Sequence, residues 1–196
     1  PKDDSEMLSV AEITERFSLD AVNRSNAKFD LKKCLWLNSQ YIMGCPLSDL
    51  RERAAPILVA AGLGESEPAL LETTIGLVRE KVQKLDELPD WIWFFFEDEI
   101  EIKPAALEKV RKNPDAPRLL GALSARLRSL EHWEAGALED SLKATVEQEG
   151  VKMGALMMPT RAAISGQLNG PGVYDIMQLL GREKTLARLD AAAESL

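Results

Sequence analysis

The sequence predicts an all-α protein of about ten helices. In nearly every segment, apolar residues recur at spacings of three and four, which is the period of an amphipathic helix. No stretch alternates convincingly between apolar and polar residues, as a half-buried strand would. Hydrophobic residues make up 45% and charged residues 29% of the 196 residues, which is ordinary for a folded protein and excludes a disordered chain.

The first helices are marked by residues that cap their N-termini. Ser9 and Glu12 have the spacing of a capping box ahead of AEITERF. Asp30 is placed to cap the next helix, FDLKKCLWLNSQYI (29–42). The residues that share one face of this helix are Leu31, Cys34, Leu35 and Asn38.

Two further helices follow in the next forty residues. Ser48 or Asp49 is predicted to open the helix DLRERAAPILVAAGL, and Pro56 to kink or end it. Gly62 and Gly64 then break the chain. We expect one helix to cover ALLETTIGLVREKVQKL, because its apolar residues form a single buried stripe: Leu71, Ile75, Val78, Val82 and Leu85.

The segment LPDWIWFFFEDEIEI is crowded with aromatic residues. Aromatic rings can stack on nucleic-acid bases, so this segment could bind RNA. The alternative is a core segment, and the spacing favours it because Leu88, Trp91 and Phe95 fall on one helical face. We therefore predict a helix that packs between two subdomains.

The second half of the chain also has helical spacing throughout. Pro104 suits the first turn of a helix. The leucines of a long helix follow at Leu119, Leu120, Leu123, Leu127 and Leu130. Leu138, Leu142 and Val146 mark the next helix, and Gly150 is expected to end it.

Several classes of protein are excluded or disfavoured by composition. No apolar run approaches the roughly 18–20 residues of a membrane helix, and no signal peptide opens the chain, which suggests a cytoplasmic protein. Cys34, Cys45 and the only histidine, His132, cannot supply the ligands of a zinc site, so we expect buried, reduced thiols and no metal. The net charge is −8, but acidic residues concentrate in 51–100, so a basic face elsewhere remains open to nucleic acid.

In the stretch RAAISGQLNGPGVYDIMQLLG (161–181), three glycines and a proline come just before an amphipathic run. The spacing of Gly166, Gly170 and Gly172 fits neither a P-loop nor a dinucleotide fingerprint, and no strand precedes it. We predict a rigid turn between two helices, with Pro171 in the first turn of the second. Arg161 and an apolar surface beside it would suit an unstacked base, although a surface arginine near a packing turn has the same pattern.

Three segments together resemble one family. FDLKKCLWLNSQYI (29–42), WFFFEDEIEI (93–102) and PTRAAISGQLNGPGVYDIMQLLGREKTLARL (159–189) are similar, in order and spacing, to the C-terminal part of bacterial-type glutamyl-tRNA synthetase. The resemblance covers essentially the whole chain. It implies a class I ligase that joins glutamate to tRNA-Glu.

The resemblance also implies a division of the chain. Residues 1–45 would be the end of a stem-contact domain, and residues 46–95 and 96–196 two helical anticodon-binding subdomains. The ATP- and Mg-binding catalytic domain, with its HIGH-type and KMSKS-type signatures, would lie upstream of Pro1, since neither signature is present. The chain alone is then expected to be an inactive, monomeric fragment with no cofactor of its own.

Site residues follow from the resemblance, position by position. Arg161 matches the arginine that contacts the anticodon, and Gly170, Pro171 and Val173 match the turn that packs against its bases. Pro171 and Val173 would supply an apolar wall. Some members carry an arginine that excludes tRNA-Gln, where this chain has Lys81.

The change to lysine at position 81 predicts relaxed specificity. Lysine is a flexible point charge without the planar donor fork of arginine, so binding of tRNA-Gln as well as tRNA-Glu is expected. Arg79 is not expected to substitute, because two helical residues lie about 200° apart around the axis.

Other basic residues are candidates to contact the tRNA backbone or to be solvated surface residues. They are Lys28, Lys32 and Lys33 near the stem-contact piece, and Arg182, Lys184 and Arg188 near the C-terminus. Trp36, Asn38 and Tyr41 are expected to form the core of the stem-contact piece. Two other functions stay open: a helical adaptor with a protein-binding groove near residues 91–96, and a synthetase-like paralogue with a different reaction.

Overall fold

The computed structural model describes residues 7–21, 26 and 28–196, and over these residues the protein is all-helical, as predicted. Its ten α-helices are α1 (Val10–Arg16), α2 (Leu31–Gly44), α3 (Leu47–Ala60), α4 (Pro68–Val78), α5 (Leu88–Ile92), α6 (Pro104–Val110), α7 (Ala116–Arg128), α8 (Ala135–Glu149), α9 (Met153–Ser165) and α10 (Val173–Ser195). Three short 3-10 helices join them: η1 (Leu19–Ala21), η2 (Leu85–Glu87) and η3 (Trp93–Phe95).

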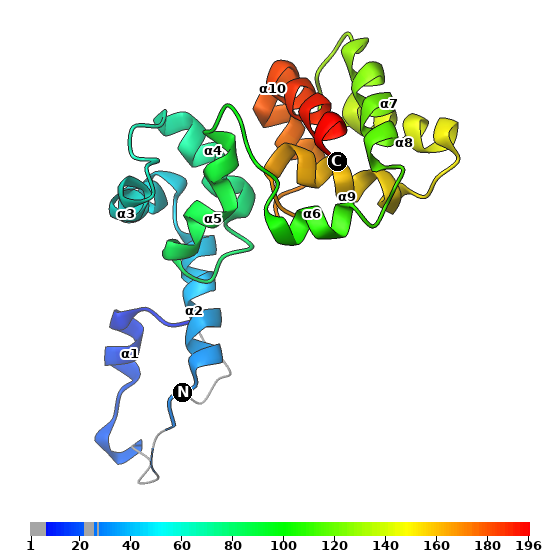
Figure 1. The fold of residues 1–196 in the computed structure, drawn as a ribbon. Helices are drawn as coiled ribbons and strands as arrows, with labels where there is room; N and C mark the ends of the chain where they lie inside the picture. The colour runs from blue at the N-terminus through cyan, green and yellow to red at the C-terminus, as the bar shows by residue number, and fades with distance from the viewer. Residues whose placement is uncertain (1–6, 22–25, 27) are drawn as a thin grey trace.

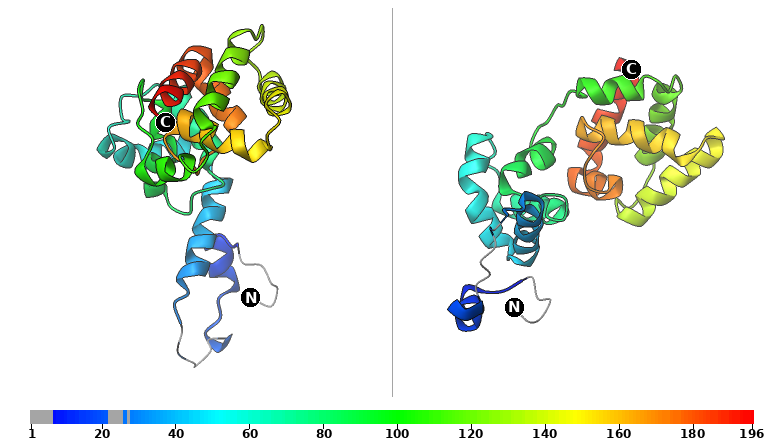
Figure 2. Two further views of the ribbon diagram at one scale, coloured as in Figure 1. Left: turned by 45° about the vertical axis from the view of Figure 1, so that its right-hand side comes forward. Right: turned by 90° about the horizontal axis from the view of Figure 1, so that it is seen from below.

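The helices form two groups and an arm (Figure 1). The first group contains α3, α4 and α5, and the second contains α6 to α10. The arm consists of α1 and the first part of α2, which project away from both groups in Figure 1 and in the left view of Figure 2. The proposed division at residues 45/46 and 95/96 stays a prediction, and residues 1–6, 22–25 and 27 of its first piece lie outside the described residues.

The arm is only lightly packed. Its predicted caps are confirmed: Ser9 and Glu12 form a capping box, and the Asp30 carboxylate accepts from the Lys33 amide at 3.0 Å. Yet α1 buries no side chain, and Trp36 and Tyr41 are 38% and 53% exposed. The expectation of a core here is therefore wrong within the described residues, because Ile42 is the only buried residue of α2.

The two cysteines also differ from the expected buried pair. Cys34 is exposed on the arm, and Cys45, just after α2, is partly buried. Asn38, expected in the core, is exposed and donates its amide to the Gln83 carbonyl. This hydrogen bond attaches the arm to the first helix group.

Two helix boundaries in the first group differ from the prediction. Helix α3 begins at Leu47 and continues through Pro56. The proline removes one hydrogen bond to the carbonyl of Glu52, but both residues are exposed, so water can take the place of the missing donor. Helix α4 ends at Val78, and a turn carries Val82 back into the core, where it is 1% exposed.

The aromatic segment is core, as its spacing indicates. Leu88, Ile92 and Phe94 are completely buried, and the rings of Phe94 and Phe95 lie 4.4 Å apart between centroids. These buried rings cannot stack on bases. Trp91, Trp93 and Phe96 are partly buried, and a protein-binding groove near residues 91–96 stays a prediction.

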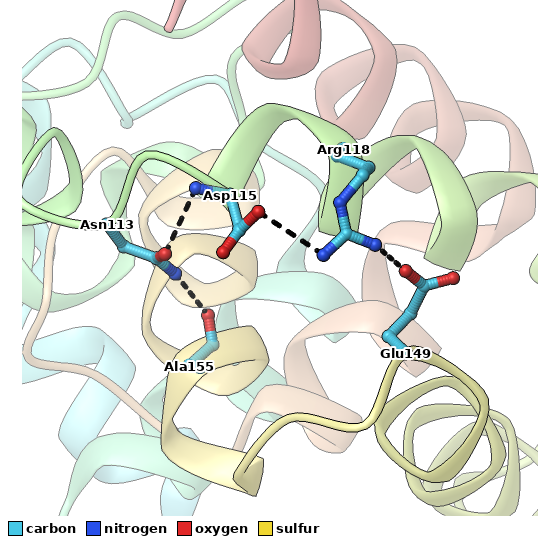
Figure 3. Close-up of polar contacts among 5 residues, drawn as sticks. All are labelled: Asn113, Asp115, Arg118, Glu149 and Ala155. Atoms are coloured by element: carbon cyan, nitrogen blue, oxygen red, sulfur yellow. Dashed lines mark hydrogen bonds and ion pairs between the residues drawn. The ribbon is translucent and has the colours of Figure 1, made fainter.

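The second group is fastened by polar contacts where four segments meet (Figure 3). Asn113 donates its amide to the Ala155 carbonyl of α9 at 3.0 Å and accepts from the Asp115 amide at 3.2 Å. Arg118 of α7 pairs with Asp115 at 3.3 Å and also with Glu149, at the end of α8. Gly150 then ends α8 in the left-handed conformation, as predicted.

Helix α10 is broken at Gly181, and its second piece joins the two groups. Gly181 has φ 78° and ψ 172°, a conformation essentially restricted to glycine. Arg188 follows on the second piece and is 5% exposed. Its guanidinium donates to the carbonyls of Ile164, Phe94 and Glu97 at 2.7, 2.8 and 2.6 Å. The arginine therefore ties α9 and α10 to the segment that follows α5.

Candidate nucleic-acid interface

The glycine turn, residues 166–172, connects α9 to α10. Gly166 ends α9 with φ 71°, and Gly172 caps the N-terminus of α10. Pro171 therefore precedes the cap. The prediction that it lies in the first turn of α10 is wrong. The predicted turn between two helices is confirmed, and its rigidity stays a prediction.

The first half of the turn rests on the segment between the two helix groups. The Gly166 carbonyl accepts from the Lys103 amide at 2.8 Å. A Cβ atom at Gly166 would lie 2.7 Å from the Glu101 carbonyl oxygen and 3.3 Å from the Trp93 ring. Gln167 adds a hydrogen bond from its side-chain amide to the Asp90 carbonyl at 3.1 Å. Glycine at 166 is thus required by both its conformation and its surroundings.

The second half of the turn is held by Arg161. This residue lies near the end of α9, half-buried, and its guanidinium donates to the Pro171 carbonyl. A Cβ atom at Gly170 would lie 3.2 Å from Nη1 of Arg161, so glycine leaves room for the guanidinium. Burial lowers the pKa of Arg161 from its ordinary value, but an arginine pKa starts so high that the group stays charged.

Pro171 and Val173 do not form an exposed apolar wall, so this part of the expectation is wrong. Pro171 is buried and Val173 is only 3% exposed, since its side chain joins the hydrophobic core. The exposed parts of the turn are polar, at Asn169 and Gly172. The turn therefore offers hydrogen-bonding groups to a partner, backed by the Arg161 guanidinium.

Lys81 lies in the turn that follows α4 and is exposed. Its backbone amide donates to the Val78 carbonyl at 2.7 Å. Arg79 and Lys81 were expected to lie about 200° apart around one helix. This expectation is wrong, because α4 ends at Val78. Arg79 is instead partly buried, and among the described residues its Nε atom has no acceptor.

The C-terminal cations are engaged within the protein. Arg182 donates to the carbonyl of Leu130 and lies 5.5 Å from the centroid of the Trp133 ring. Lys184 pairs with Asp98 at 2.8 Å, and Arg188 is buried as described above. Arg182 and Lys184 are partly exposed, so their contact with the tRNA backbone stays a prediction. Arg188 is 5% exposed and donates to three backbone carbonyls, so for this residue the expectation is wrong.

The lysines of the arm stay candidates for contact with the tRNA backbone. Lys28, Lys32 and Lys33 are all exposed at or near the start of α2. Their contact with a tRNA backbone stays a prediction.

Within residues 7–21, 26 and 28–196, no cluster of three or more His, Cys, Asp or Glu side chains is placed to hold a metal ion. None of the helices built from the described residues is long and apolar enough to cross a membrane.

Sequence reasoning missed Lys103 and Gln167. Their side chains meet at the glycine turn, with Nζ and Oε1 2.9 Å apart, although 64 positions separate them in the chain. The only local signal is Pro104, which starts α6 and so fixes the direction of the chain at Lys103.

Residues 49–193 match the family described as the anticodon binding domain. Over 96% of its length the chain is 44% identical to a glutamate–tRNA ligase of Akkermansia muciniphila, and over 97% it is 34% identical to that of Thermus thermophilus. It covers 42% and 40% of those two relatives.

A solved structure has the same fold. The crystal structure of a glutamate–tRNA ligase from Elizabethkingia meningosepticum superposes on the whole chain with a TM-score of 0.85 and 28% identity, and the chain covers 38% of it. A helical fold shared over the full length and a family match across most of the chain lead to one conclusion. The chain belongs to the anticodon-binding domain family, of the type found in glutamate–tRNA ligases.

Proposed function

We propose that this chain binds tRNA-Glu through its anticodon, as part of a glutamate–tRNA ligase. The family match over residues 49–193 is the observation that carries the proposal. The part of the ligase that uses ATP and Mg would be supplied by residues outside this chain, and the chain alone would be inactive. A monomeric, cytoplasmic protein fits this role.

The glycine turn is the proposed contact with the anticodon. Arg161 lies behind the turn with a charged planar fork, of which the Pro171 carbonyl takes one donor. A guanidinium has five N–H donors, so an RNA base or phosphate could still be bound. Asn169 and Gly172 are the exposed groups that would meet the RNA first.

The test is a titration of the chain into labelled tRNA-Glu at low and moderate salt. Arg161→Met should weaken binding about tenfold or more, because a hydrogen bond to a charged group contributes roughly 1.5–3 kcal/mol. Arg128→Met is the matched control, since Arg128 is exposed on α7 and pairs with Asp190. Thermal unfolding of both variants checks that they fold.

The outcomes separate the proposal from its alternatives. Binding to tRNA-Glu that weakens steeply with salt and falls selectively in Arg161→Met supports anticodon capture. Equal binding by wild type and Arg161→Met would remove the proposed role of the turn. No binding even at low salt would contradict the proposal as a whole and favour a protein adaptor.

A further inference from the structure

The side chain of Lys103 lies beside the glycine turn. Its Nζ atom is 2.9 Å from the Oε1 atom of Gln167 and 5.4 Å from the centroid of the Trp93 ring. Its backbone amide also donates to Gly166, so both the main chain and the side chain are fixed at this place. The residue is nevertheless exposed.

Gln167 orients the ammonium group of Lys103. The carbonyl of Asp90 can only accept a hydrogen bond, so the amide nitrogen of Gln167 faces it, at 3.1 Å. The amide oxygen must then face the other way, toward an ammonium that can only donate. Gln167 thereby holds Lys103 at the edge of the turn.

The charge of Lys103 is not compensated by an ion pair in the part of the chain that the structure describes. Many of the other cations pair with carboxylates, as in Arg51–Glu72, Lys84–Asp86, Lys112–Glu108, Lys143–Glu139 and Lys184–Asp98. Lys103 and Arg161, the two cations that contact the turn, have neutral acceptors as their hydrogen-bond partners. The nearby Asp90 and Glu101 present backbone carbonyls to the turn.

We propose that Lys103 binds a backbone phosphate of the RNA whose base is received at the glycine turn. A lysine ammonium has three donors, and Gln167 takes one, so two donors and the full charge face the solvent. In a chain of net charge −8, a cation held in place without an acidic partner is suited to a polyanion. Gln167 acts as its positioning residue. This inference rests on the proposed anticodon-binding function.

The test compares Lys103→Met with Lys152→Met in tRNA-Glu binding over a series of salt concentrations. Methionine keeps an apolar stem against Trp93 but removes the charge. Lys152 is equally exposed but lies at the opposite end of α9, whose thirteen residues span about 20 Å, or twice the screening length at 0.1 M salt.

For single-stranded RNA, loss of one phosphate contact reduces the steepness of log K against log salt by about 0.7. Binding is then about eightfold weaker at 50 mM salt, and the loss disappears at about 1 M salt. We expect this for Lys103→Met, no change for Lys152→Met, and a restored slope for Lys103→Arg. Thermal unfolding should show all three variants folded. A structural role would instead weaken binding equally at every salt concentration.

Three results would overturn the inference. They are an unchanged slope in Lys103→Met, a loss that does not depend on salt, and an equal loss in Lys152→Met. Each leaves the proposed function standing as long as the wild type binds tRNA-Glu and Arg161→Met binds it more weakly. If the wild type fails to bind any tRNA, both the inference and the proposed function fall.

Discussion

Arg161 and Arg188, on neighbouring helices, differ in how much of each guanidinium is used within the fold. Each donates to backbone carbonyls, and desolvation lowers the pKa of each from its ordinary value. Arg188 donates to three carbonyls and is 5% exposed, so its hydrogen bonds are used within the fold. Arg161 donates to one carbonyl and is only half-buried, which leaves donors for a ligand. At the scale of the residue, the hydrogen-bond partners of an arginine determine whether donors remain for a ligand.

Lys81→Arg should sharpen the choice between tRNA-Glu and tRNA-Gln. A guanidinium can make a bidentate contact with a base, and such a contact is worth roughly 1–3 kcal/mol of discrimination, so the ratio of the two dissociation constants should rise about tenfold. Lys84→Arg, three positions on and paired with Asp86, is the matched control. Equal ratios in the wild type and Lys81→Arg would show that position 81 does not read the anticodon.

At the scale of the element, contacts near both ends of the glycine turn determine its shape. Gly166 rests against Trp93 and the Glu101 carbonyl, and Gly170 leaves space for the Arg161 guanidinium. Both glycines allow close approach of the backbone to another group, which a side chain would prevent. The turn thus holds its shape through contacts with the segment between the helix groups and with the end of α9.

Gly166→Ala is expected to destabilise the protein by about 1–3 kcal/mol, because alanine would be strained at positive φ and would clash with the Glu101 carbonyl. Gly121→Ala is the control, since Gly121 lies inside α7 with open space around it and alanine there should stabilise by about 0.5–1 kcal/mol. Urea denaturation of both variants measures the difference. A neutral Gly166→Ala would mean that the turn can relax.

For the whole molecule, the two helix groups share one hydrophobic core, and a few long-range hydrogen bonds also join them. Arg188 connects α10 to the carbonyls that follow α5, and Gln167 connects the turn to Asp90 of α5. Asn38 attaches the arm to the first group. We expect these contacts to set the distance between Lys81 and the glycine turn, which lie in different groups.

Arg188→Met should lower the free energy of unfolding by about 3 kcal/mol, since it leaves three carbonyls without their charged donor. It should also weaken tRNA binding, because the two groups lose their fixed arrangement. Lys143→Met provides the comparison: it removes an exposed pair within α8, worth about 0.3–0.5 kcal/mol. The arrangement would not depend on Arg188 if both variants unfolded at the same urea concentration.

Much of the local structure was determined by the sequence alone. The spacing of apolar residues predicted the helices, because a helix places residues three and four apart on one face. Ser9, Asp30 and Gly150 marked helix ends through side-chain and backbone preferences that act over a few residues. The three segments 29–42, 93–102 and 159–189, taken together in order and spacing, were enough to indicate the family.

The tertiary structure alone decided which side chains are available to a partner. Val173 and Pro171 are buried, and Arg182 and Lys184 contact residues far away in the chain. Lys103 reaches the turn across 64 positions. Helical periodicity and capping are local, whereas burial and charge pairing depend on which elements meet, so only the folded protein separates its recognition residues from its structural ones.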